Sequence, residues 1–118
     1  MSTHLGEFEK LLLFALLADG KDADGASLRQ HIEDRTGRVV SPGAVYTAMD
    51  RLQGRGFVGS EVVNAPPEQG GRRQKRYRLR PEGALALDRT VRELESMSRG
   101  LDDALTEAVD AALGGGEQ

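Results

Sequence analysis

The stretch SPGAVYTAMDRLQGRG, residues 41–56, contains the signals for a complete helix. Ser41 is a residue type that caps helix N-termini, and Pro42 suits the first helical position. Apolar residues then recur at i, i+4 and i+7, which predicts one buried face made of Val45, Met49 and Leu52. The outward face of this helix carries Ala44, Tyr46, Thr47, Asp50 and Arg51. Glycines at positions 54 and 56 are expected to end the helix.

Two further helices are predicted on the N-terminal side of this stretch. The first spans residues 7–19 and ends before a glycine; its apolar side chains are Leu11, Leu12, Leu13, Phe14, Leu16 and Leu17. Because a helix that is apolar on every side is normally buried on every side, we expect a partner from outside the domain to cover it. The second spans about Asp24 to Arg35, with Leu28 and Ile32 four residues apart and Gly37 just past its end.

The hydrophobic period changes after residue 56. Residues 57–65 (FVGSEVVNA) and 74–80 (QKRYRLR) resemble two strands, joined by a loop rich in proline and glycine. From Pro81 the pattern is helical again to about Leu113. We predict a mainly α fold with a small β-hairpin: a winged helix-turn-helix at residues 1–80, a C-terminal dimerisation helix at 81–113 and a flexible tail at 114–118.

Composition excludes several classes of function. The 118-residue chain has no cysteine and two isolated histidines, so we expect no disulfide, no metal site and no cofactor. The longest apolar run, Leu11 to Ala18, is shorter than the roughly 20 residues that span a bilayer, and no secretory signal is visible. We therefore expect a soluble cytoplasmic protein. No serine–histidine–acid arrangement and no phosphate-binding glycine motif is present, so we predict that the chain is not an enzyme.

Positive charge is concentrated in one short segment. The stretch GGRRQKRYRLR, residues 70–80, holds six basic residues and no acidic one, although the chain has a net charge of −3. Residues 1–80 carry 13 Lys and Arg against 10 Asp and Glu, whereas residues 81–118 carry 3 against 9. The excess of positive charge in residues 1–80 favours the binding of a polyanion. A solvated charged strand and a localisation signal are the alternatives for this segment.

Three blocks together resemble one known family. They are LGEFEKLLLFALL (5–17), GAVYTAMDRLQGRGFV (43–58) and GGRRQKRYRLRPEG (70–83). The chain is similar to the PadR-type transcriptional regulators, in their short form with a single C-terminal helix. It departs from them at Asp24, where the family usually has tyrosine, and at Arg80, where it usually has threonine. The resemblance implies a sequence-specific regulator of transcription, a repressor, that binds double-stranded DNA at an inverted repeat as a homodimer.

The resemblance also implies which residues contact DNA. Base edges would be read by Tyr46, Thr47 and Arg51 of the third helix, while Ser41 and the backbone near Gly43 contact phosphate. A wing at the hairpin tip would add Arg72, Arg73, Lys75 and Arg76. The structural alternative is that Tyr46 packs against the hairpin and Arg51 is merely solvated.

The terminal helix has the spacing of a helix that pairs with another helix. Apolar residues alternate by four and three, which is a heptad pattern. With the first helix, it predicts a dimer interface of Leu12, Leu16, Leu87, Val91, Leu94, Leu101 and Leu105. A glycine at position 100 predicts a kink in this helix. The alternatives are a terminal helix that folds back on its own domain and, for the whole chain, a helical protein-interaction adaptor that does not bind DNA.

A small-molecule effector is a further implication of the resemblance. In this family, small aromatic or cationic molecules can bind at or near the dimer interface. The region from Pro81 onward has no Trp, Tyr or Phe, so a pocket would use Phe8, Phe14, Met97 or leucines. The sequence identifies neither an effector, nor the operator, nor the regulated gene.

Overall fold

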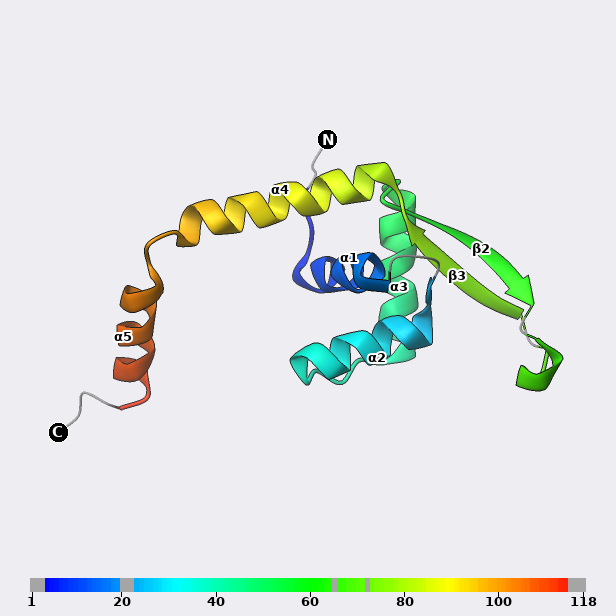
Figure 1. The fold of residues 1–118 in the computed structure, drawn as a ribbon, viewed down its shortest axis with the longest axis horizontal. Coiled ribbons are helices and arrows are strands. Elements are labelled where there is room, and N and C mark those ends of the chain that lie inside the picture. Colours follow the sequence, from blue (N-terminus) through cyan, green and yellow to red (C-terminus); the bar gives the residue numbers. More distant parts are fainter. Residues whose placement is uncertain (1–3, 20–22, 65, 72, 115–118) are drawn as a thin grey trace. The chain divides into compact units, whose positions relative to one another are not determined.

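A computed structural model of the protein describes residues 4–19, 23–64, 66–71 and 73–114 (Figure 1). Its elements, in chain order, are α1 (Glu7–Asp19), β1 (Ala23–Asp24), α2 (Gly25–Thr36), α3 (Pro42–Gly54), β2 (Val58–Asn64), the 3-10 helix η1 (Pro67–Gln69), β3 (Arg73–Leu79), α4 (Pro81–Ser98) and α5 (Asp102–Ala112). The chain forms two compact units, residues 1–88 and 89–118. Among the described residues, no helix has the length and apolar character that crossing a membrane requires.

The helix boundaries in the first unit follow local capping signals. Asp24 caps α2, because its carboxylate accepts a hydrogen bond of 2.8 Å from the Ser27 N–H. Gly37 ends that helix with a positive φ of 76°, a conformation that glycine adopts without strain. Ser41 caps α3 by accepting from the Ala44 N–H at 3.1 Å, and Pro42 is the first helical residue. The predicted start of α3 is thus confirmed.

The sheet has three strands in the order β1-β3-β2, all antiparallel. The predicted hairpin is confirmed: Val58 pairs with Leu79 at its base and Asn64 with Arg73 near its tip. The strand β1 was not predicted; it pairs Ala23 with Tyr77. In Figure 1 the β2–β3 ribbon extends beyond the three helices and carries η1 at its far end.

The core of the first unit lies where α1, α2, α3 and the sheet meet. Its fully buried side chains come from every one of these elements and include Leu12, Leu13, Leu16, Leu28, Val45, Met49, Leu52, Val58 and Tyr77. The expected external cover for α1 is therefore needed only in part, because the chain itself buries most of that helix. Phe14 and Leu17 remain outside, with 40% and 56% of their surface exposed.

This burial corrects three of the predicted dimer contacts. Leu12, Leu16 and Leu87 are 0%, 2% and 3% exposed within a single chain. A side chain that its own domain already encloses has no surface left to offer a second copy. The compact unit also extends to residue 88 rather than 80, since Gly83, Ala86 and Leu87 of α4 are buried.

The predicted terminal helix, expected to kink at Gly100, is divided there into the two helices α4 and α5. α4 ends at Ser98, whose carbonyl accepts a hydrogen bond of 3.0 Å from the Leu101 N–H. Gly100 has a φ of 78°, which lies outside the helical region, and a second helix starts at Asp102. The expected kink is thus a full interruption. From Arg92 to residue 114 every described side chain is exposed.

Candidate nucleic-acid interface

The helix α3 has one buried and one exposed face. Val45, Ala48, Met49 and Leu52 point into the core. Because the helix has 3.6 residues per turn, the residues between them face outward. All of the predicted α3 contact residues are exposed: Ser41, Gly43, Tyr46, Thr47 and Arg51. The structure therefore brings these residues together on one open face, as the periodicity predicted.

The start of α3 presents a backbone donor at the surface. The Ser41 hydroxyl and carbonyl accept from the Ala44 and Val45 N–H groups, and Pro42 has no N–H, so the Gly43 N–H is the helical amide left at the open end. A Cβ at Gly43 would meet nothing within 4 Å, so the surface there is open. The helix dipole adds partial positive charge at this end. Such an N-terminus suits a phosphate oxygen.

Tyr46 lies between solvent and the start of α2. Its side chain is partly exposed, at 46%, and a Cβ at Gly25 would lie 3.6 Å from the Tyr46 Cζ atom. The ring therefore lies beside the first residue of α2, where an added Cβ would make ordinary van der Waals contact with it. The rest of the ring stays open to a ligand.

The wing strand β3 separates its basic residues onto two faces. Tyr77 is fully buried, and the Lys75 Nζ lies 5.8 Å from its ring centroid. Since side chains alternate along a strand, Arg73 shares the face of these two residues. Arg76 and Arg78 take the other face, where Arg78 lies 3.9 Å from the Glu61 carboxylate. Of the four predicted wing contacts, Arg73 and Lys75 are thus on the α3 side, Arg76 is on the outer side, and Arg72 lies outside the described residues.

A charged contact joins the wing to α3. The Lys75 Nζ lies 3.8 Å from the Asp50 Oδ1, with the two side chains 37% and 68% exposed. This pair was missed by sequence reasoning, because Asp50 was placed on the outward face without a role. Hydrophobic spacing contains no signal for an ion pair between residues 25 positions apart.

Tyr77 anchors β3 to the helices beneath. Its hydroxyl is buried and has no hydrogen-bond partner among the described residues. Burial, together with the nearby Tyr46 and the Asp50 carboxylate, raises the pKa of Tyr77 to about 12. The phenol therefore stays neutral at physiological pH and serves as an apolar anchor.

The two arginines near the end of α3, Arg51 and Arg55, differ in whether other residues of the chain bind them. The Arg55 guanidinium donates to the Glu9 carboxylate at 3.3 Å and to the His4 carbonyl at 2.6 Å. It also lies 4.7 Å from the Phe57 ring centroid, so it ties α1 to the end of α3. Arg51, by contrast, has no ion-pair partner in the described part of the chain. Arg51 is thus available for an external anion.

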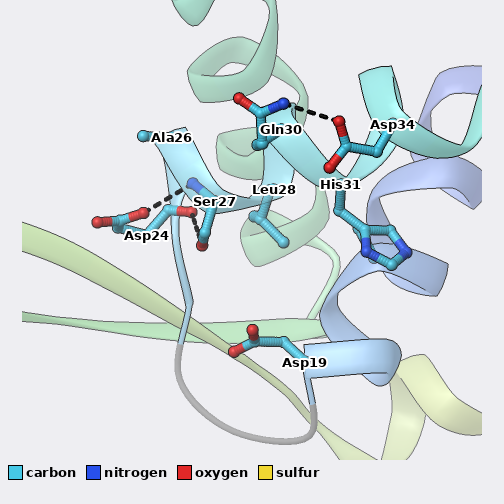
Figure 2. Close-up of a pocket in the computed structure, with 9 residues that line it drawn as sticks. Asp19, Asp24, Ala26, Ser27, Leu28, Gln30, His31 and Asp34 are labelled. Atoms are coloured by element: carbon cyan, nitrogen blue, oxygen red, sulfur yellow. Dashed lines mark hydrogen bonds between the residues drawn. The ribbon is translucent and has the colours of Figure 1, made fainter. Parts of the chain in front are cut away.

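One hollow of the first unit is lined by several acidic side chains, which would repel the phosphates of a nucleic acid. It lies between the end of α1 and α2, has a volume of about 520 Å³, and includes Asp19, Asp24, Asp34 and His31 (Figure 2). Asp24 and Asp34 are already engaged, by the Ser27 N–H and the Gln30 amide. Over the ranges that the structure describes, no three His, Asp or Glu residues gather as a metal site.

The helix pair α2–α3, followed by the β2–β3 hairpin, defines the winged helix-turn-helix class of DNA-binding proteins. The model of the transcriptional regulator PadR-like family matches residues 13–89, and the chain belongs to this family. The chain is 37% identical over 84 residues to the transcriptional regulator Rv3488 of Mycobacterium tuberculosis (strain ATCC 25618 / H37Rv). That match covers 70% of this chain and 72% of that protein. The family resemblance predicted from the sequence is thus confirmed.

Solved structures share the fold. A PadR family transcription regulator from Clostridium difficile R20291 superposes with a TM-score of 0.69 at 22% identity, over 85% of this chain and 99% of that one. A winged-helix DNA-binding protein from STIV reaches a TM-score of 0.65 at 18% identity, over 82% of this chain and 97% of that one. The family and Rv3488 are thus transcriptional regulators, and the STIV protein is a DNA-binding protein.

Proposed function

We propose that this protein is a cytoplasmic transcriptional repressor that binds an inverted-repeat DNA operator as a homodimer. The observation that carries the proposal is the juxtaposition of the exposed α3 face with the Arg73–Lys75 face of the wing, joined through Asp50. Repression needs only that the protein occupies a site overlapping a promoter. Activation would need a polymerase contact in addition, so repression is the simpler function.

The DNA contacts follow from this arrangement. α3 enters the major groove, where Thr47 and Arg51 reach base edges and Tyr46 adds an apolar and hydroxyl contact. Its N-terminus lies against a phosphate. Arg73 near the hairpin tip follows the backbone into the neighbouring minor groove, and the predicted contact of Arg72 lies outside the described residues. Arg76 lies on the outer face of the wing, so its contribution is to the general positive potential.

The homodimer rests on the apolar residues that one chain leaves uncovered. Leu94, Leu101 and Leu105 are 57%, 51% and 66% exposed, and Val91 is partly exposed. Uncovered leucines repeated along consecutive helices mark an interaction site. We propose that a second copy covers them, together with Phe14 and Leu17 of α1 in place of the buried Leu12 and Leu16. A two-fold dimer presents two α3 helices, which requires an operator with two inverted half-sites about 10 base pairs apart, or a multiple.

A small-molecule effector is a secondary part of the proposal. An apolar hollow of about 280 Å³ lies between α1 and α2, lined by Leu11, Phe14, Leu17 and Ile32. It includes the same exposed Phe14 and Leu17 that the dimer uses, so a molecule bound there would alter the subunit contact. Thermal shift with a panel of small aromatic compounds tests this part, and a panel without any shift would remove the effector from the proposal.

Selection of bound sequences from random DNA tests the main proposal. Wild-type protein should enrich an inverted repeat, and it should elute from heparin at a high salt concentration. Sequencing that returns no enriched motif, with no retention on heparin, would instead favour a protein-interaction adaptor. Sedimentation at micromolar concentration then measures the oligomeric state independently.

A further inference from the structure

Asp50 is an unusual residue for the DNA-facing side of α3. It is the one acidic residue between positions 35 and 60, and its side chain is 68% exposed. It follows Tyr46 by one helical turn and precedes Arg51, so it shares the face that meets DNA. A carboxylate near phosphates costs free energy through like-charge repulsion. A purely electrostatic binding surface would therefore not place it there.

The structure places this carboxylate beside a cation of the wing. The Lys75 Nζ lies 3.8 Å from its Oδ1, and the same ammonium group lies 5.8 Å from the ring centroid of the buried Tyr77. Tyr77 is fixed by the sheet, since it pairs with Ala23 of β1 and Ser60 of β2. Farther along α3, Gln53 accepts a hydrogen bond of 3.0 Å from the Ser60 hydroxyl, which ties the same helix to β2. The lysine beside Asp50 therefore comes from a strand whose pairing and whose tie to α3 are fixed.

An ionised carboxylate can only accept hydrogen bonds. In the major groove, the matching donor is an exocyclic amino group, and the cytosine N4 group is the usual partner of Asp and Glu. We propose that Asp50 is a specificity-determining residue that accepts from a cytosine amino group in each half-site and penalises DNA without an amine at that position. Lys75 is the positioning residue that holds the carboxylate and reduces its repulsion by phosphate. This inference rests on the proposed DNA-binding function and names the base class that one residue reads.

The test compares Asp50→Asn with Glu61→Gln. Both variants remove one carboxylate, so they change the net charge equally, but Glu61 pairs with Arg78 on the outer face of the wing. Fluorescence anisotropy gives Kd for three duplexes: the selected operator, the operator with the contacted C·G pair replaced by T·A, and random DNA. The ratio of Kd values, rather than either Kd alone, is the readout.

Asp50→Asn should bind random DNA more tightly while its operator-to-random ratio falls by roughly 5- to 100-fold, the range that one good base contact provides. Glu61→Gln should tighten binding to all three duplexes by the same factor and keep the wild-type ratio. Repeating the selection with Asp50→Asn should lose the cytosine preference at one position of each half-site. If Asp50→Asn keeps the same ratio and the same selected motif as Glu61→Gln, the inference is wrong.

Two more variants separate base reading from support of the fold. Asp50→Glu keeps the charge but moves the carboxylate. Its preference for the operator over random DNA should therefore fall, while its affinity for random DNA stays the same. Lys75→Gln should weaken binding to every duplex and lower the ratio, whereas Lys75→Arg should restore the ratio. Normal discrimination by Asp50→Glu and Lys75→Gln would also overturn the inference. A wild-type protein without any sequence preference would instead refute the proposed function itself.

Discussion

Gly83 is the position where a single methyl group should have the clearest effect on stability. It is the third residue of α4, and a Cβ there would overlap the Phe57 carbonyl oxygen and lie 2.9 Å from the Leu79 Cδ1. The Phe57 carbonyl is held in place, because it accepts a hydrogen bond of 3.0 Å from the Arg80 N–H. If the Phe57 carbonyl and the start of α4 moved apart, this hydrogen bond would be lost. We therefore expect Gly83→Ala to displace the start of α4.

Two opposing effects decide the magnitude. Alanine is favoured over glycine within a helix by about 1 kcal/mol. Overpacking against an immobile neighbour costs about 1–3 kcal/mol, and loss of the Arg80–Phe57 hydrogen bond costs about 1 kcal/mol more. The free energy of unfolding should therefore fall by about 1–3 kcal/mol, since overlap outweighs propensity. For a domain of this size that corresponds to a decrease in Tm of roughly 5–15 °C.

Thermal unfolding followed by circular dichroism measures this change, and Gly54→Ala is the matched control. Gly54 is the last residue of α3, and a Cβ there would meet nothing within 4 Å. Gly54→Ala should therefore match or exceed the wild-type Tm. A Tm of Gly83→Ala at or above that of the wild type would show that α4 does not pack on Phe57 in this way.

Three other predictions test the wing, the dimer and the core. Arg73→Ala should weaken binding to operator and random DNA alike and make the salt slope shallower by about 1 unit; an unchanged slope in gel-shift titrations would exclude a phosphate contact. Leu105→Asp should yield monomer in sedimentation at micromolar concentration, because dimerisation would bury an unpaired carboxylate at a cost of several kcal/mol. If the wild-type protein is itself a monomer in this experiment, the proposed interface is wrong. Tyr77→Phe should keep or raise stability at pH 7, since the hydroxyl has no partner among the described residues. The pKa of Tyr77 in the folded protein is raised above the ordinary value of 10.0 to about 12. The wild-type free energy of unfolding should therefore fall as pH rises from 10 to about 12, by about 1.4 kcal/mol for each pH unit. Tyr77→Phe has no phenol to ionise, so its free energy of unfolding should not show this decrease.

Local signals predicted most of the secondary structure. The cap Ser41, the terminating Gly37 and the alternation around Tyr77 each act over a few residues, so they can be read from neighbouring positions alone. The same periodicity predicted which side of α3 faces outward, and all its predicted contact residues are exposed. Their contact with DNA stays a prediction, as does the dimer.

Other features needed the folded chain. The two-residue strand β1 has no period to detect, and it exists only because β3 has an open edge beside Ala23. The leucines of α1 look alike in sequence, yet the neighbouring helices cover Leu12 and Leu16 and leave Leu17 outside. Gly100 favoured a kink, but its actual positive φ interrupts the helix entirely.

The sequence by itself thus determined the order of helices and strands, the family and the exposed face of α3. Only the tertiary structure decided which basic residues share that face, and that Lys75 reaches Asp50 from another element. The physical reason is the sequence separation over which each interaction acts. Helix caps and hydrophobic periods act between residues a few positions apart, whereas an ion pair between a helix and a strand depends on the register of β3 and on how closely it packs against α3.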